Sequence, residues 1–431
     1  MPPVASNELR TTTASLMEGV ADLDNLRQAY RKVRANRGAP GPDGMTVGEL
    51  GQWLAVHAEA LRRELLEGRY LPQPVRGVAI PKPGGGERTL GIPNVLDRLV
   101  QQALLQRLEP IFDPAFSESS FGFRPGRSAH DALRQGQQHV EEGREFVVDL
   151  DLEKFFDRVN HDVLMSRVAR RVDDKRVLGL IRRFLNAGMM AQGVCVRREE
   201  GTPQGGPLSP LLANILLDDL DKELERRGHH FCRYADDVNI YVASLKAGER
   251  VMASVTGFLE KRLKLRVNRA KSAVDHVRHR KFLGFRILGL GGGLGIHPQS
   301  VTRFKDKVRG LLKRNRPGKM PRVVEEVNRL LRGWMGYFRL GRIKGLSGIL
   351  DAWIRRKLRC LKLKRCKRAV GIGRFLRSRG LDVEAAGWLA CSGKGWWRLS
   401  KTQQAHQAMG TEWFRELGLA SLSDEYARLS T

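Results

Sequence analysis

Two segments far apart in the chain carry aspartates that could hold metal ions together. Residues 231–242 alternate around Ala235, Asp236 and Asp237, and their Phe, Tyr, Val and Ile content predicts two strands with the acidic pair at the turn. Adjacent carboxylates repel unless a cation lies between them, and hard divalent ions such as Mg²⁺ prefer oxygen ligands. Because aspartate is also a common turn residue, this pair alone fits an ordinary polar turn equally well.

A third carboxylate favours the metal site over the ordinary polar turn. Residues 145–157 begin as an apolar strand whose alternation places Asp149 and Asp151 on one face. If this strand pairs beside the predicted hairpin, Asp151 faces Asp236 and Asp237. Three carboxylates that hold two Mg²⁺ ions about 3.5 to 4 Å apart suit in-line phosphoryl transfer, because one ion activates the attacking hydroxyl and the other neutralises the leaving pyrophosphate. This is a polymerase arrangement, and the alternative is a strand with surface acids.

A glycine-rich turn precedes a predicted helix. Residues 201–210 read Gly-Thr-Pro-Gln-Gly-Gly-Pro-Leu-Ser-Pro, with Ser209 placed as the N-cap and Pro210 as the first helical residue. Backbone N–H groups and Gln204 in such a turn can approach a nucleotide closely, and a tight turn without a ligand is an equally good interpretation. Leucines then recur at every fourth position, which predicts a buried stripe. They are Leu212, Leu216, Leu220 and Leu224.

Together these motifs resemble bacterial group II intron-encoded reverse transcriptases, also called maturases. The resemblance rests on Tyr-Ala-Asp-Asp at 234–237, Gln-Gly-Gly-Pro-Leu-Ser-Pro at 204–210, Asp-Leu-Glu-Lys-Phe-Phe-Asp at 151–157, and Ile-Pro-Lys-Pro-Gly-Gly-Gly-Glu-Arg-Thr-Leu-Gly-Ile-Pro at 80–93. Their order and spacing also agree with the family. The similarity covers nearly the whole chain, from residues 38–44 to residues 394–400.

The resemblance implies roles for individual residues. Asp151, Asp236 and Asp237 resemble the catalytic metal-binding triad of the family, which implies two Mg²⁺ ions, with Mn²⁺ as a substitute. Phe156 resembles the gate that collides with a ribose 2′-hydroxyl and so selects deoxynucleotides, although most phenylalanines are core residues. Gln204 resembles a residue that lines the incoming nucleotide.

Three basic residues fall where fingers residues of the family contact the template or the triphosphate. Lys82 and Arg88 are assigned to the nucleotide, since a triphosphate requires cations of this kind in any case. Arg76 is assigned to the template. In so basic a chain a solvated face is a stronger alternative for Arg76 than for the other two.

The charge of the chain favours a nucleic-acid partner. Its formal net charge is +29, from 76 Lys and Arg against 47 Asp and Glu, and polyanion binding is the commonest use of such an excess. The excess is concentrated in residues 301–370, which hold 23 Lys and Arg against 4 acidic residues. This segment is therefore the predicted RNA platform.

Helical periodicity organises this basic segment. A helix predicted over residues 322–340 has one apolar face, formed by Val323, Val327, Leu330, Trp334 and Phe338. Its candidate RNA-binding arginines share the opposite face: Arg322, Arg329, Arg332 and Arg339. The run 351–368, with Arg355 and Arg356 as further candidates, is less segregated and predicts a helix that lies against RNA. With a helix near 300–315 these elements predict a three-helix thumb, which in the family is the domain X that binds intron RNA.

We expect an α+β fold of the right-hand polymerase type, with fingers, a palm built on an antiparallel sheet, a helical thumb (maturase domain X) and a small C-terminal helical DNA-binding domain. The expected parts are an N-terminal extension at 1–65, fingers and palm at 66–295, the thumb at 296–370 and the DNA-binding domain at 371–431. Glycines at 289–295, after a strand predicted at 281–288, are interpreted as a flexible turn between palm and thumb.

Aromatic residues mark the last of these parts. Trp388, Trp396 and Trp397 lie among basic residues, where they can either stack on unpaired bases or form the core of a small helical domain. Paired cysteines of an HNH endonuclease, which many relatives carry, are not found there, so we expect the form of the family that lacks this nuclease.

Five cysteines without a CxxC pair predict reduced, cytosolic thiols, and the resemblance implies that the cytoplasm is bacterial. His229, His230 and Cys232 lack a fourth ligand and are not assigned to zinc. No apolar run is long enough to span a bilayer, so no membrane partner is expected.

The expected function is that of an RNA-directed DNA polymerase that extends a DNA primer on an RNA template with deoxynucleotides. The resemblance further implies binding to the host group II intron RNA, help with its splicing and mobility, and contact with target DNA. Two alternatives remain: a reverse transcriptase of a defence or diversification system, and a nonenzymatic RNA-binding splicing factor on a polymerase scaffold.

Overall fold

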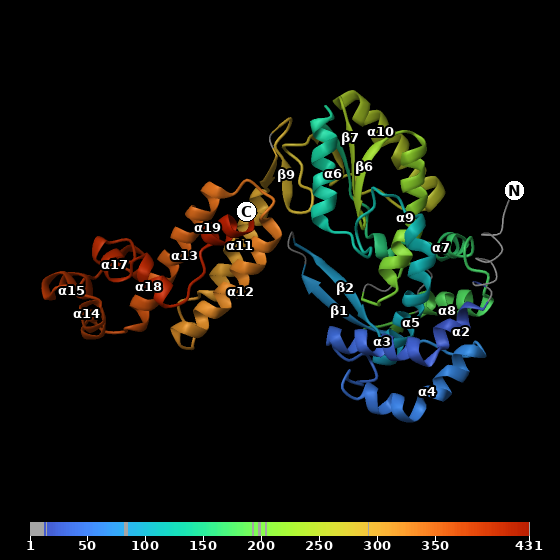
Figure 1. Cartoon of the computed structure of the whole chain (residues 1–431), viewed down its shortest axis with the longest axis horizontal. Coiled ribbons are helices and arrows are strands. Elements are labelled where there is room, and N and C mark those ends of the chain that lie inside the picture. Colours follow the sequence, from blue (N-terminus) through green and yellow to red (C-terminus); the bar gives the residue numbers. More distant parts are fainter. Residues whose placement is uncertain are drawn as a thin grey trace. The chain divides into compact units, whose positions relative to one another are not determined.

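The computed structural model describes residue 13 and residues 15–81, 85–191, 194–196, 200–202, 205–291 and 293–430. The chain divides into two compact units, Met1–His276 and Val277–Thr431, and each is described by itself (Figure 1). The first unit combines sheets with helices and the second is mostly helical, so the expected α+β class is confirmed. Within the described residues, no helix combines the length and the apolar character needed to cross a membrane.

Three helices open the first unit: α2 (Leu16–Ala21), α3 (Leu23–Asn36) and α4 (Leu50–Leu66). The segment between α3 and α4 is held against α5 (Val95–Phe112). Nη2 of Arg98 donates to the carbonyl of Ala39 at 2.7 Å. A Cβ on Gly41 would lie 2.2 Å from Oδ1 of Asn94, so this approach requires glycine.

Two four-stranded sheets follow. The fingers sheet has the order β2-β1-β4-β5, formed by β1 (Val75–Pro81), β2 (Glu87–Ile92), β4 (Met189–Ala191) and β5 (Val194–Val196). The palm sheet has the order β6-β7-β3-β8, formed by β3 (Phe146–Leu150), β6 (His230–Tyr234), β7 (Asp237–Val242) and β8 (Ala273–His276). All neighbours in the palm sheet are antiparallel, as expected.

Helices α6 (Ala129–Glu141) and α10 (Leu245–Phe258) pack on the palm sheet. The remaining helices of this unit are α7 (His161–Val168), α8 (Lys175–Asn186), α9 (Ser209–Arg226), and the short η1 (Asp113–Ala115), η2 (Phe155–Asp157) and η3 (Leu259–Leu263). The leucine stripe of α9 is confirmed, since all four of its leucines are buried. The predicted cap is wrong by one position, because Leu208 is the N-cap of α9, and Ser209 and Pro210 are its first two residues.

The second unit begins with a hairpin of β9 (Phe285–Ile287) and β10 (Leu294–Ile296). The strand predicted at 281–288 is thus shorter than expected. Gly289, Gly291 and Gly293 lie between the two strands of this hairpin, and Gly295 lies in β10. Three helices form the expected thumb bundle: α11 (Pro298–Leu311), α12 (Met320–Phe338) and α13 (Lys344–Arg365).

The C-terminal region is built from short helices: α14 (Ala369–Ser378), α15 (Val383–Ala390), α16 (Trp396–Leu399), α17 (Gln403–Ala408), α18 (Thr411–Glu416) and α19 (Leu422–Ser430). The last of these returns to pack on α12 and α13 (Figure 1). Buried Asp351 of α13 accepts hydrogen bonds from the backbone N–H groups of Leu422 and Ser423, at 2.8 and 3.0 Å, and so fixes the start of α19.

Candidate active site

Strand pairing brings the three predicted aspartates to one end of the palm sheet. The antiparallel register of β3 and β7 runs to the pair Leu150 and Val238, and the next residues of the two segments are Asp151 and Asp237. Strands β6 and β7 are joined by a two-residue turn, Ala235–Asp236. Asp236 therefore lies in the turn, Asp237 opens β7, and Asp151 directly follows β3.

The charges of these aspartates influence one another. Burial raises the pKa of Asp236 above its usual value, and the negative charge of Asp151 raises it further. Lys271 partly offsets this repulsion, with its Nζ 3.5 Å from Oδ2 of Asp151. A buried carboxylate whose ionisation is disfavoured, as that of Asp236 is, is stabilised by a bound cation, so the donor set fits divalent metal ions with oxygen preference.

The backbone of Asp151 is held on both sides. Its N–H donates to Oγ of Ser272 at 2.9 Å, and its carbonyl accepts from the N–H of Asn268 at 2.8 Å. These bonds come from the segment that leads into β8, the neighbour of β3 in the sheet. Asp151 is therefore fixed in place although it lies outside the strand ladder.

A buried arginine donates a hydrogen bond to the backbone of the turn. Arg233 is fully buried, and its guanidinium donates to both carboxylate oxygens of Asp221 at 2.6 to 3.0 Å. It also donates to Oδ1 of Asn214 at 2.8 Å, to Oγ of Ser120 at 2.7 Å and to the carbonyl of Ala235 at 3.0 Å. Sequence analysis missed this network, although an arginine inside an apolar strand and an acid on the leucine face of α9 both require buried partners.

The segment that contains Phe121 and Gly122 packs directly against the backbone of this turn. A Cβ on Gly122 would lie 2.2 Å from the backbone nitrogen of Ala235, so only glycine fits there. Phe121 donates its N–H to the carbonyl of Arg233 at 2.9 Å. Ala235 itself has a φ of 58°, a left-handed conformation that is unfavourable for a residue with a side chain. The conformation of this hairpin turn is thus imposed by its surroundings.

A cavity of about 480 Å³ in the same unit is lined by Phe156 and by the glycine-rich turn, and its other lining residues include Phe123 and Arg98. Phe156 is half-buried, whereas its neighbour Phe155 belongs to the core, and both lie in η2 rather than on a strand. The N–H of Thr202 donates to the carbonyl of Phe156 at 2.6 Å, which joins the two motifs. Phe156 is therefore placed to limit what enters this cavity.

Of the other residues predicted to contact the nucleotide or the template, two lie outside the described residues, namely Lys82 and Gln204. Arg88 lies on β2 opposite Ile80 of β1. Arg76 lies on β1, half-buried, and its Nε has no hydrogen-bond partner within the described part of the chain. The roles of these four residues stay predictions.

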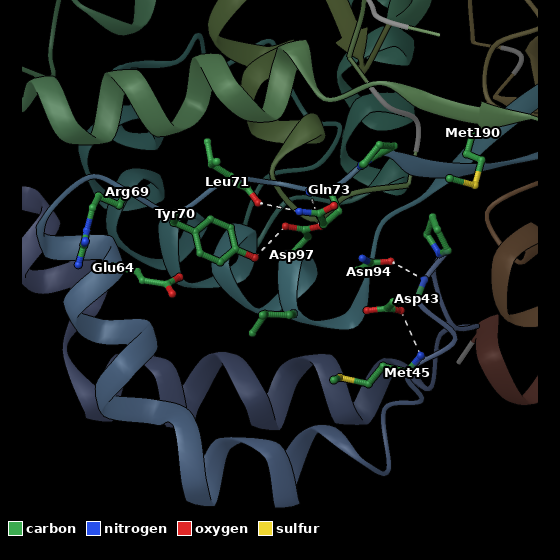
Figure 2. A pocket seen from close by; sticks show the side chains of 13 residues that line it. Asp43, Met45, Glu64, Arg69, Tyr70, Leu71, Gln73, Asn94, Asp97 and Met190 are labelled. Carbon is green, nitrogen blue, oxygen red and sulfur yellow. Dashed lines mark hydrogen bonds between the residues drawn. The ribbon is translucent and has the colours of Figure 1, made fainter. Parts of the chain in front are cut away.

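A second cavity, of about 780 Å³, lies beside the N-terminal helices (Figure 2). Oη of Tyr70 donates to one carboxylate oxygen of Asp97 at 2.8 Å, and the N–H of Gln73 donates to the other at 3.2 Å. Burial raises the pKa of Asp97 to about 6. None of the three predicted catalytic aspartates lines this cavity.

The predicted arginine face of α12 is exposed in the second unit. Arg322, Arg329, Arg332 and Arg339 all point to solvent. Val323, Val327, Trp334 and Phe338 are buried on the other side, as predicted. Leu330 is only half-buried, and Leu331 takes its place in the core.

The two candidate arginines of α13 are half-buried. The guanidinium of Arg356 lies 3.8 Å from the ring centroid of Trp397 and donates to its backbone carbonyl at 3.1 Å, so this arginine is already engaged within the protein. The neighbouring Arg359, which sequence analysis did not single out, is buried and donates to the carbonyls of Ser400 and Met409. Trp388 is 54% exposed, and Nζ of Lys394 lies 5.7 Å from the centroid of its ring.

An antiparallel sheet with an acidic pair in a hairpin turn and a third aspartate at the end of the adjoining strand defines the palm of a nucleic-acid polymerase. The reverse transcriptase (RNA-dependent DNA polymerase) family matches residues 80–287 of the chain, and the group II intron maturase-specific domain matches residues 301–379. The chain belongs to the family of group II intron reverse transcriptases and maturases, and its enzymatic activity is RNA-directed DNA polymerisation.

Curated relatives support this membership. Protein YkfC of Escherichia coli K12 is 38% identical over 314 residues, which are 63% of this chain and 82% of that protein. The group II intron-encoded protein LtrA of Lactococcus lactis subsp. cremoris is 37% identical over 195 residues, which are 45% of this chain and 32% of LtrA. The putative COX1/OXI3 intron 1 protein of Saccharomyces cerevisiae is 31% identical over 60% of this chain and 30% of that protein. The chain thus spans about a third of the length of the latter two.

Solved structures are more distant. A chain of a Cas6-RT-Cas1–Cas2 complex has a TM-score of 0.37 at 25% identity, covering 57% of this chain and 42% of that one. Telomerase from Candida albicans has a TM-score of 0.44 at 13% identity, and the match covers 78% of this chain and 70% of that one. At these scores neither structure adds to the assignment.

Proposed function

We propose that the enzyme extends a DNA primer on an RNA template at Asp151, Asp236 and Asp237, which would hold two Mg²⁺ ions, with Mn²⁺ as a substitute. The observation that carries the proposal is the pairing register, which brings carboxylates from distant parts of the chain to one end of the palm sheet. The bound ions would supply the Lewis acid that activates the primer 3′-hydroxyl and neutralises pyrophosphate. The protein contributes a rigid cradle, because the turn is held by Arg233 and the backbone of Asp151 is held by Ser272.

The deoxynucleotide is proposed to enter beside Phe156, which excludes a 2′-hydroxyl. Lys82 and Arg88 would hold the triphosphate, and Gln204 would line the base and sugar. The support for these three roles is their place in family motifs, together with the need of a triphosphate for cations.

The second unit is proposed to bind the host intron RNA and so to assist splicing and mobility. The support is the exposed arginine face of α12 within the matched maturase-specific domain. Because this domain is present, the intron type is favoured over reverse transcriptases of defence or diversification systems.

The C-terminal helices, with exposed Trp388, are proposed to contact target DNA. A bacterial cytoplasmic location is proposed from the resemblance, and the free cysteines among the described residues support a reducing compartment.

Primer extension on an RNA template tests the chemistry. Asp151→Asn removes one metal-ligand charge and should lower incorporation by about a thousandfold, because a catalytic metal supplies several kcal/mol of transition-state stabilisation. Asp149→Asn is the matched control, since Asp149 lies on the same strand face two residues further from the turn. Equal incorporation by wild type and Asp151→Asn would refute the metal assignment.

A further inference from the structure

A second group of metal-binding side chains lies at the other end of β6 from the catalytic turn. His139 lies in the last turn of α6, Glu142 is the C-cap of that helix, and His230 is the first residue of β6. Their ligand atoms all lie within 4.8 Å of one another. Since a strand rises about 3.3 Å per residue, this group is roughly 20 Å from Asp236 and separate from the catalytic aspartates.

His139 is buried without a hydrogen-bond partner. It is only 8% exposed, and among the described residues neither of its ring nitrogens forms a hydrogen bond. Its Nδ1 lies 3.8 Å from Oε2 of Glu142, which is longer than a hydrogen bond. A buried imidazole left in this way is costly, and a missing ion is one of the few physical reasons for it.

The guanidinium of Arg144 already lies between the side chains of Glu142 and His230. Nη1 of Arg144 donates to Oε2 of Glu142 at 2.6 Å, and Nη2 of the same residue is 2.7 Å from Nε2 of His230. Arginine can only donate, so Nε2 of His230 must accept and must carry a free lone pair. A carboxylate oxygen and an imidazole lone pair therefore both point at one cation, as they would in a metal site.

We propose that His139, Glu142 and His230 bind a divalent transition metal of the Zn²⁺ class, which displaces the guanidinium of Arg144. Two imidazoles and one carboxylate are a donor set that Zn²⁺ accepts, with water in the fourth position, whereas Mg²⁺ requires oxygen ligands. The metal joins the end of α6 to the start of β6. It thereby braces the strand whose other end carries the catalytic turn.

Calorimetric titration with Zn²⁺ tests this site directly. The chain is produced without a histidine tag and stripped with a chelator, and excess Mg²⁺ is kept present so that the aspartates are occupied by the ion they prefer. Wild type should bind one equivalent of Zn²⁺. Glu142→Gln and His230→Ala should each weaken this binding by at least roughly tenfold, because each removes one of three ligands. His229→Ala is the matched control and should bind as wild type does.

The charge variant Arg144→Gln gives a signature that an unrelated zinc site would not show. Removing the competing guanidinium should tighten Zn²⁺ binding, whereas an unchanged affinity would overturn the proposed displacement. The decisive ligand variants are on Glu142 and His230, because His139→Ala opens a cavity and can fail to fold. Thermal unfolding without metal shows whether each variant is folded before titration. No stoichiometric Zn²⁺ binding, or binding that Glu142→Gln and His230→Ala leave unchanged, would overturn the proposal.

Discussion

Arg233 links the catalytic turn to the interior of the first unit. Its guanidinium is neutralised by Asp221 of α9 and at the same time donates to the carbonyl of Ala235 within the turn. A buried ion pair of this kind adds little net stability, but removing one partner leaves the other charge buried and uncompensated. Arg233 is therefore a positioning residue, which acts on Asp236 through the shape of the turn.

Replacing Arg233 should affect stability and catalysis separately. Arg233→Met should lower the free energy of unfolding by about 3 to 5 kcal/mol, because Asp221 is left unpaired. The double variant Arg233→Met/Asp221→Leu should regain most of that stability and still have a reduced kcat with little change in KM. Urea unfolding and steady-state primer extension measure the two effects. A double variant with the kcat of wild type would show that Arg233 is structural only.

Phe156 and Phe155 provide a matched pair for sugar selection. Phe156→Ala should lower discrimination against ribonucleotides by at least about tenfold, since the side chain that lines the cavity is lost. Phe155→Leu should lower stability and leave discrimination unchanged, because Phe155 is a core residue. Competition between deoxynucleotide and ribonucleotide incorporation measures both variants. Unchanged selectivity in Phe156→Ala would place the gate elsewhere.

At the scale of elements, the start of α5 carries a charge that opposes folding at neutral pH. Asp97 lies in the first turn of this helix, where the helix dipole favours an anion, but burial has the larger effect and raises its pKa to about 6 (Figure 2). The folded state therefore binds this proton more tightly than the unfolded chain does. The resulting stabilisation is fully present below about pH 4 and is lost as the pH rises through 6.

Asp97→Asn should remove this dependence on pH. Between pH 4 and pH 7, wild type should lose roughly 2 kcal/mol more stability than Asp97→Asn does, given the difference from the usual value of 3.8. Chemical denaturation at several pH values, compared between the two proteins, isolates the contribution of this group. Parallel stability curves for the two proteins would contradict the assignment.

Features that depend on residues within a single helix could be predicted from the sequence. Hydrophobic periodicity predicted the leucine stripe of α9 and the arginine face of α12, because each depends on neighbours within one helix. The capping preference of Ser209 placed the start of α9 one residue too late, because a favourable cap residue does not by itself fix the first residue of a helix. The three aspartates were found because the residue types and the family motif both mark them.

Networks joined across long stretches of chain were not predicted. Arg233 meets Ser120, and His139 meets His230, through contacts that the palm sheet creates. Periodicity shows which side of an element is buried, but not which polar group from elsewhere will face it. For His230 the sequence suggested neighbours on its own strand, whereas the fold supplies Glu142 and His139 from α6.

At the scale of the whole molecule, the excess positive charge should govern RNA affinity. Arg322, Arg329 and Arg332 are exposed on α12, although each lies within 4 Å of a glutamate. Alanine at all three positions should weaken RNA binding and lower the slope of log K against log salt by about two to three, since each phosphate contact contributes about 0.7 to 0.9.

The matched control uses exposed arginines of the first unit that also pair with acids. Arg27→Ala/Arg134→Ala/Arg226→Ala should leave the salt dependence unchanged, because these side chains lie outside the proposed platform. Binding of intron RNA measured over a range of salt concentrations compares the two sets. An equal change of slope in both would mean that charge alone, and not the arginine face of α12, determines binding.

The return of α19 to the thumb helices affects the order in which the protein matures on the ribosome. Asp351 must wait for Leu422 and Ser423 before its hydrogen bonds can form. The polymerase palm can therefore fold while translation continues, whereas the thumb is completed only after the chain has been synthesised through α19. A nascent chain would acquire its catalytic sheet before its finished RNA-binding surface.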